Sequence, residues 1–195
     1  LENASFHVAG IKKSERRKYP AAPFTTSNLQ QEASRKLGFT TQKTMQIAQQ
    51  LYEGVEIAGE GSQGLVSYIR TDSTRIADEA MEAVRSMISE NYPAEFLPEK
   101  PNVYKTRSSA QDAHEAIRPT HVELDPERIE KSLTKEQYRL YKLIWSRFLA
   151  SQMANAVYDN VAVEVRSADH AFRANYSELK FKGFTAVYYK SIHLL

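Results

Sequence analysis

One tyrosine of this chain has neighbours whose types and spacing suit chemistry on a phosphodiester. Tyr68, Arg70 and Asp72 occupy alternate positions. In an extended backbone they would share one face, while Leu65 and Ile69 would face a core. The planar fork of arginine matches phosphate oxygens, and its charge favours an ionised phenol. The spacing is therefore compatible with attack by the tyrosine on phosphorus, but taken alone it favours a buried tyrosine beside a surface ion pair.

Two other motifs lack the context that their chemistry requires. Gly59, Gly61 and Gly64 have the spacing of a dinucleotide-binding fingerprint. That fingerprint follows a strand and opens a helix, whereas here a helix precedes and an extended segment follows, so we interpret it as a flexible loop. His114 and Glu115 match the first two residues of a zinc-protease motif, but Arg118 occupies the position of its second histidine. We therefore expect no metal ligands here, and no phosphate-binding loop for ATP is visible.

Composition narrows the class of protein. The 195 residues contain no cysteine and are 42% hydrophobic, which suits a chain with a packed core and excludes a disulfide scaffold. No apolar run approaches a membrane span and no signal peptide is evident, so we expect a soluble, cytoplasmic protein.

Basic charge is concentrated near the start of the sequence. Residues 1–50 hold eight Lys or Arg against three Glu, while acidic residues exceed basic ones in the remainder. This indicates either a polyanion partner or a solvated basic linker.

The elements that must position these side chains are mostly helical. Apolar periodicity and capping signals mark the helix boundaries. The predicted starts are Ser27 with Gln30, Asp125 ahead of a proline, and Thr134 with Gln137, and Gly38 is predicted to end the first helix. Alternating patterns predict strands at both ends of the chain. The first two helices resemble a helix-turn-helix, which could dock on DNA or be an ordinary helical hairpin. Helices are predicted near residues 27–37, 41–52, 74–91, 110–117, 126–133 and 134–153, and strands near 5–11, 157–165, 171–176 and 185–189.

This order predicts a mainly α chain with flanking β segments, an α+β fold. A helical domain, with its helix-turn-helix-like elements, is inserted into a β domain that is incomplete here. We expect a strand and a basic connector over residues 1–22, the helical domain over 23–154, and returning strands over 155–195. The tyrosine segment, residues 64–73, falls inside the helical domain.

Four blocks, read together, resemble the type IA DNA topoisomerases of bacteria, the topoisomerase I group. They are residues 23–33 (PFTTSNLQQEA), 51–54 (LYEG), the Tyr68 segment, and 113–120 (AHEAIRPT). Both order and spacing fit, and the resemblance covers essentially the whole chain. It implies that the β segments belong to an arch that carries the helical domain.

The resemblance also implies a mechanism. Tyr68 would attack one strand of single-stranded DNA, form a 5′-phosphotyrosine ester and release a 3′-hydroxyl. Because the ester conserves the bond energy, strand passage and religation would relax negative supercoils without ATP. Arg70 would contact the scissile phosphate, supported by Asp72 and His114. Arg70, Arg118 and Ser67 are candidate DNA contacts, although Arg118 could equally form a salt bridge.

One part of the family pattern is missing. Members carry a TOPRIM domain whose acidic cluster binds Mg²⁺, and nothing in this sequence matches it. We therefore expect a fragment that is inactive alone, with Mg²⁺ ligands and remaining domains elsewhere in the full-length protein. A competing hypothesis is a non-catalytic DNA-binding helical module.

Overall fold

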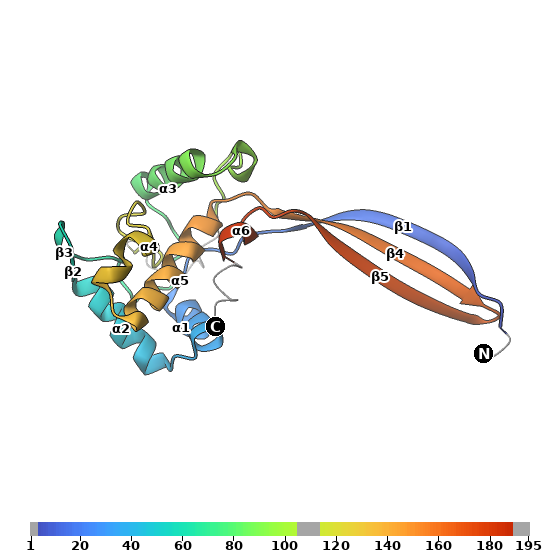
Figure 1. The fold of residues 1–195 in the computed structure, drawn as a ribbon, viewed down its shortest axis with the longest axis horizontal. Coiled ribbons are helices and arrows are strands. Elements are labelled where there is room, and N and C mark those ends of the chain that lie inside the picture. Colours follow the sequence, from blue (N-terminus) through green and yellow to red (C-terminus); the bar gives the residue numbers. More distant parts are fainter. Residues whose placement is uncertain (1–3, 105–113, 189–195) are drawn as a thin grey trace. The chain divides into compact units, whose positions relative to one another are not determined.

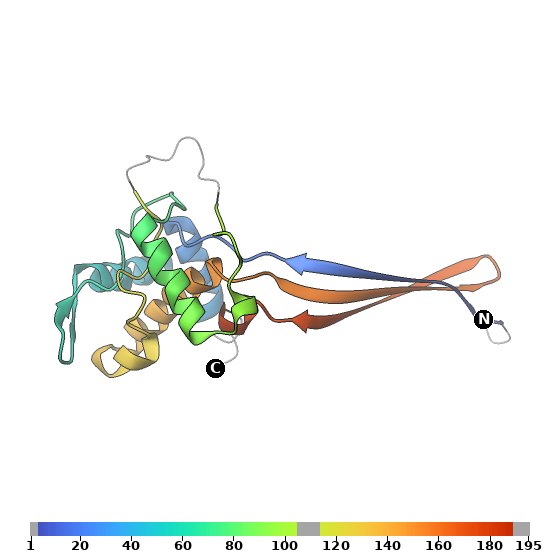
Figure 2. The same cartoon turned by 90° about the horizontal axis from the view of Figure 1, so that it is seen from above.

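The computed structural model describes residues 4–104 and 114–188, and these form two compact units (Figures 1 and 2). The sheet unit comprises residues 4–19 and 155–183. The helical unit comprises residues 20–104, 114–154 and 184–188. No helix in these ranges is both long enough and apolar enough to cross a membrane.

The sheet unit is an antiparallel sheet of three long strands, ordered β1 (His7–Lys18), β4 (Ala156–Ser167), β5 (His170–Phe181). The strands run side by side along their length (Figures 1 and 2). The prediction of a basic connector after a short strand is wrong, because the run of Lys and Arg lies within β1 and pairs with β4. An edge strand tolerates such charges, since its side chains reach water and discourage pairing with other chains.

The helical unit is built around one long helix, α5 (Lys135–Ser151), which contacts α1, α2, α4 and α6. Ten of its seventeen residues are buried, among them Tyr141, Trp145 and Phe148. The other elements are α1 (Thr26–Leu37), α2 (Thr41–Glu53), β2 (Val55–Ile57), β3 (Gly61–Gln63), α3 (Asp78–Asn91), the 3₁₀ turns η1 (Ala94–Phe96) and η2 (Glu130–Ser132), α4 (Pro126–Ile129) and α6 (Thr185–Tyr188).

Most helix boundaries follow local capping chemistry. Thr134 and Gln137 form the reciprocal capping box predicted for α5. Asp125 caps α4 ahead of a proline, as expected. Gly38 ends α1 in the left-handed conformation, with φ of 68°. The start of α1 differs from the prediction: Thr25 rather than Ser27 is the N-cap, and its hydroxyl accepts from the Asn28 N–H.

Three predicted elements are corrected. The stretch around Gly59 and Gly61, predicted to be a flexible loop, forms the short β2–β3 hairpin. The predicted strand near 185–189 is helical over α6, because the Tyr188 hydroxyl donates to Glu32 and accepts from Arg147 within the helical unit. The first half of the predicted helix at 110–117 lies outside the described residues, and its second half, 114–117, is not helical.

Candidate active site

The residues expected to do chemistry line one open pocket of about 700 Å³. Tyr68, Arg70 and Asp72 come from the segment between β3 and α3, and His114 comes from a separate stretch more than forty residues later. The N-terminal turn of α1 completes the wall. The structure therefore brings together four residues that the sequence separates; the full lining is Thr26, Ser27, Tyr68, Arg70, Thr71, Asp72 and His114.

The tyrosine segment alternates between solvent and core, as predicted. Tyr68, Arg70 and Asp72 are exposed, whereas Ile69 and Thr71 between them are buried. The segment is not a strand, however. Its regular pairing is limited to one isolated bridge outside these five residues, so other contacts must hold the alternation in place.

A strap formed by residues 114–120 runs beside this segment and places His114 at the pocket. The strap forms isolated antiparallel bridges at Ile117 with Phe24 and at Pro119 with Val66. The Ile117 N–H donates to the Phe24 carbonyl at 2.8 Å. Since Ile117 and Phe24 are fully buried, the strap is fixed to the core of the helical unit.

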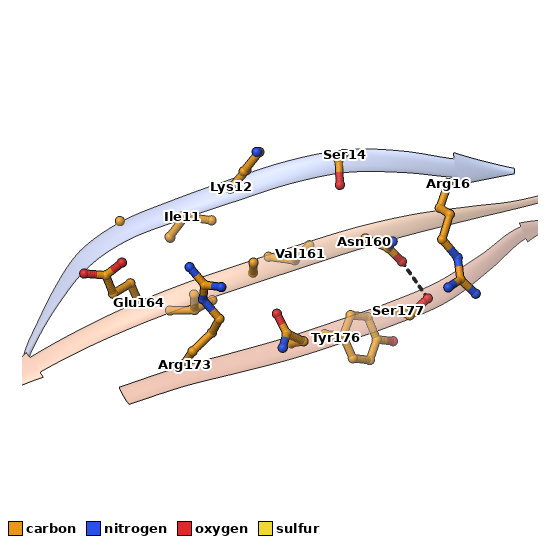
Figure 3. A pocket seen from close by; sticks show the side chains of 14 residues that line it. Ile11, Lys12, Ser14, Arg16, Asn160, Val161, Glu164, Arg173, Tyr176 and Ser177 are labelled. Carbon is orange, nitrogen blue, oxygen red and sulfur yellow. Dashed lines mark hydrogen bonds between the residues drawn. The ribbon is translucent and has the colours of Figure 1, made fainter. Parts of the chain in front are cut away.

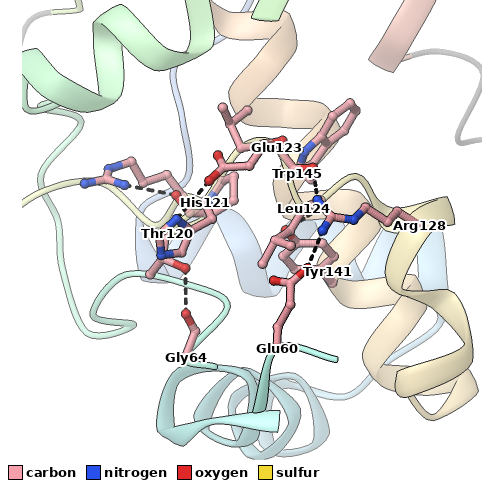
Figure 4. A network of polar contacts seen from close by, with 12 residues as sticks. Glu60, Gly64, Thr120, His121, Glu123, Leu124, Arg128, Tyr141 and Trp145 are labelled. Atoms are coloured by element: carbon pink, nitrogen blue, oxygen red, sulfur yellow. Dashed lines mark hydrogen bonds and ion pairs between the residues drawn. The ribbon is translucent and has the colours of Figure 1, made fainter. Parts of the chain in front are cut away.

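The strap continues into a polar network that ties it to α5 (Figure 4). The Trp145 indole N–H donates to the Val122 carbonyl at 2.8 Å, and the Tyr141 hydroxyl donates to the Leu124 carbonyl at 2.7 Å. Burial raises the pKa of Tyr141 far above its ordinary value, so this hydroxyl stays a donor at any physiological pH. Thr120 adds a bond to the Gly64 carbonyl at 2.6 Å, at the start of the tyrosine segment.

The Tyr68 ring stands between two other rings and remains open to solvent. Its centroid lies 5.4 Å from that of His114, tilted by 32°, and 5.8 Å from that of Tyr52, nearly edge-on at 69°. Such contacts orient an aromatic ring without burying it. Tyr68 is 42% exposed, so the alternative of a buried structural tyrosine is wrong.

Gly64 sets the approach of α2 to this segment. A Cβ at this position would lie 2.9 Å from the Tyr52 carbonyl oxygen, closer than real Cβ atoms come to backbone. The adjacent Leu65 N–H donates to the Leu51 carbonyl at 2.7 Å. The end of α2 and the start of the tyrosine segment are thus in direct backbone contact.

Arg70 has no hydrogen-bond or ion-pair partner among the described residues. The expected pairing of Asp72 with Arg70 is not formed within the 4.0 Å that defines an ion pair. Both side chains are exposed at the pocket. An exposed guanidinium without a carboxylate partner keeps its full donor set for an anionic ligand.

The remaining two candidate contacts make bonds within the protein. The Ser67 hydroxyl donates to the Ala116 carbonyl at 2.7 Å and accepts from the Arg118 N–H at 3.0 Å, which joins the tyrosine segment to the strap. The Arg118 side chain forms the salt bridge that the sequence left open, at 2.7 Å from Glu115. These bonds show what both residues do for the fold; whether either contacts DNA stays a prediction.

Thr26 and Ser27 are pocket residues that the motif analysis did not assign to the site. The sequence signal was present, because both lie in the PFTTS stretch, but a serine or threonine near a helix start reads as a cap. Only the spatial pairing of α1 with the tyrosine segment reveals them.

A second hollow, also of about 700 Å³, lies on one face of the sheet unit (Figure 3). Side chains from all three strands line it, and Ser177 donates to Asn160 across β5 and β4 at 2.7 Å. It contains none of the residues predicted for the site. Within the described residues, no three His, Asp or Glu side chains converge as metal ligands.

Three comparisons identify the class of protein to which this chain belongs. The family model described as DNA topoisomerase matches residues 1–193, and the chain belongs to that family. It is similar to proteins named DNA topoisomerase 1 from two strains of Xylella fastidiosa, Temecula1 and 9a5c. With each it shares 48% identity over 184 residues, which is 93% of this chain and 23% of the relative.

A solved structure agrees. The chain superposes on full-length topoisomerase I from Thermotoga maritima with a TM-score of 0.82 and 42% identity, covering 94% of this chain and 29% of that one. The chain thus spans less than a third of the length of the relatives that it matches.

Proposed function

We propose that this chain carries the nucleophile of a type IA DNA topoisomerase, and that Tyr68 is that nucleophile. The observation that carries the proposal is the open pocket in which the exposed Tyr68 meets Arg70, Asp72 and His114. The names of the relatives supply the substrate, DNA.

In the proposed reaction, a bond forms between the Tyr68 oxygen and phosphorus of one strand while the bond from phosphorus to the 3′ oxygen breaks. The phenolic proton passes overall to the departing 3′ oxygen. Reversal reseals the strand, so no ATP is consumed in relaxing negative supercoils. Arg70 stabilises charge on the phosphate oxygens, and His114 and Asp72 orient the reacting groups. Single-stranded DNA is the segment cut.

The proposal extends to the complete enzyme. There, Mg²⁺ would be held by a TOPRIM domain outside this chain, and the whole protein would act in the cytoplasm on the nucleoid DNA. The isolated chain would neither cleave nor relax DNA.

The test is covalent trapping in the full-length enzyme. A single-stranded oligonucleotide labelled at its 3′ end leaves its label on the protein if a 5′-phosphotyrosine forms. Tyr68→Phe should abolish this adduct, because no nucleophilic oxygen remains, and should leave oligonucleotide binding nearly intact. Tyr19→Phe is the matched control, since Tyr19 is 71% exposed and lies outside the pocket.

Two outcomes would contradict the proposal. A labelled adduct with Tyr68→Phe would show that another residue is the nucleophile. If instead the unsubstituted enzyme binds the oligonucleotide but never forms an adduct, the non-catalytic DNA-binding module is the better description.

A further inference from the structure

The backbone of the tyrosine segment is not held by a sheet. Between Tyr68 and Asp72 it belongs to no strand, and an isolated extended segment at a surface would sample many backbone conformations. Yet catalysis by positioned groups requires the reacting atoms to be held within fractions of an ångström. Some residue outside the segment must supply that restraint.

One side chain makes most of the backbone contacts in question. The Thr26 hydroxyl lies 2.8 Å from the Ile69 carbonyl oxygen and 3.0 Å from the Thr71 carbonyl oxygen, and its single proton is shared between these two acceptors. The same oxygen accepts from the Thr71 N–H at 2.8 Å. The Thr26 N–H also donates to the Thr71 carbonyl at 2.9 Å. Among the described residues, every hydrogen bond of the backbone from 68 to 71 involves Thr26.

These contacts fall on the buried members of the alternation. Because Thr26 holds the backbone of Ile69 and Thr71, the intervening Arg70 and the preceding Tyr68 are directed to the pocket. A twist of the segment by one residue would exchange exposed and buried side chains. The Thr26 contacts therefore lie at the backbone positions whose orientation decides which side chains reach the pocket.

Thr26 is itself well anchored. It is the first residue of α1, directly after the N-cap Thr25, and α1 packs through Leu29 and Ala33, both fully buried. Its hydroxyl is engaged by three backbone groups, which leaves it little capacity to bind a ligand directly. Its effect on chemistry would act through the segment that it holds.

We propose that Thr26 is a positioning residue that fixes the Tyr68–Arg70 segment in its reactive arrangement through its side-chain hydroxyl. The inference rests on the proposed function of Tyr68 and adds to it a residue on a different element, α1. It requires the hydroxyl but not the methyl group of the threonine.

The experiment compares Thr26→Val and Thr26→Ser in the full-length enzyme. Valine keeps the shape but leaves the Ile69 carbonyl and the Thr71 N–H without their partner, while the Thr71 carbonyl still accepts from the Thr26 N–H. Serine keeps the oxygen. We expect Thr26→Val to lower the single-turnover rate of adduct formation about 10–100-fold at saturating 3′-labelled oligonucleotide, with its Kd changed less than about twofold. Thr26→Ser should retain a rate within about twofold of the unsubstituted enzyme.

The matched control is Thr44→Val. Thr44 is a buried threonine of α2 whose hydroxyl donates to the Thr40 carbonyl at 2.9 Å, away from the pocket. Thr44→Val, like Thr26→Val, removes a hydroxyl that donates to a backbone carbonyl. A general loss of stability would therefore appear in both variants. We expect Thr44→Val to cleave at the unsubstituted rate.

The inference is overturned if Thr26→Val cleaves at the unsubstituted rate, if Thr44→Val slows cleavage as much, or if serine does not rescue. Should Thr26→Val fail to fold, Thr26→Ala replaces it, and equal rates for the alanine and serine variants overturn the inference. Failure of the proposed function looks different: it is an adduct with Tyr68→Phe, whatever Thr26 does.

Discussion

The two units of this chain are stabilised in different ways. In the helical unit, α5 and its neighbours enclose a continuous core that includes Leu140, Ile144 and Phe148. In the sheet unit, Ala156 is the sole buried hydrophobic residue among those described, and β1 and β5 expose nearly every side chain. The sheet relies on long hydrogen-bonded ladders and cross-strand pairs. The candidate site thus lies on the unit whose buried core can hold the site's side chains in fixed positions.

The largest expected effect tests this difference in packing directly. Phe148→Ala removes a ring that is 1% exposed and should lower the free energy of unfolding by about 3–5 kcal/mol. Ile11→Ala in β1 removes a side chain that is 61% exposed and should change it by less than about 0.5 kcal/mol. Urea titration followed by circular dichroism and by the fluorescence of Trp145, the one tryptophan of the chain, measures both. Equal losses would refute the comparison.

The next effect contrasts the cations of the two units. Arg70 has no ion-pair partner among the described residues, whereas Arg166 in β4 lies 2.7 Å from Glu164. In the full-length enzyme, Arg70→Ala should slow adduct formation about 10²–10³-fold, because a donor to the developing charge is lost. Arg166→Ala should leave the rate within about twofold. Near-normal cleavage by Arg70→Ala would place this residue outside the phosphate site.

The smallest effect concerns the cross-strand pairs of the sheet unit. Lys180 in β5 lies 3.2 Å from Glu15 in β1 and 3.4 Å from Asp159 in β4. The hydrogen bond from Lys180 is the main reason that the pKa of Glu15 is below its ordinary value. Because the folded-state pKa is lowered, the pair stabilises the fold above the unfolded pKa of Glu15, and this contribution is lost as pH falls through the folded value.

Lys180→Ala should therefore raise the pKa of Glu15 toward its ordinary value, which an NMR pH titration of its carboxyl carbon measures. Lys12→Ala, a cation elsewhere on β1, serves as the control and should leave that pKa unchanged. If Glu15 titrates identically in all three proteins, the cross-strand pair does not form in solution.

Local signals predicted the helical unit well. The α5 capping box, the proline after Asp125 and the left-handed Gly38 are short-range features that need no tertiary partner. The exposure pattern around Tyr68 also followed from simple alternation. Such features are read correctly because the cause lies within a few residues of its effect.

The errors have a different physical origin. The charged part of β1 was assigned to a connector because its pairing with β4 joins residues about 150 positions apart. The pattern at residues 185–189 predicts a strand, but the Tyr188 hydroxyl donates to Glu32 and accepts from Arg147 in the helical unit. The sequence does not predict the contacts of Thr26 for the same reason, because its bonds to Ile69 and Thr71 join positions more than forty residues apart. In each case a long-range contact outweighs the local pattern.

The bare Cα of Gly64 has a consequence for how substitutions in this region would spread. Any side chain there must push back the Tyr52 carbonyl, and the ring of Tyr52 leans on that of Tyr68. The displacement caused by a single added methyl group would thus pass through the end of α2 to Tyr68. The absence of a side chain at position 64 therefore allows the close contact between α2 and the tyrosine segment. We expect substitutions near the pocket to be tolerated less at Gly64 than at its neighbours.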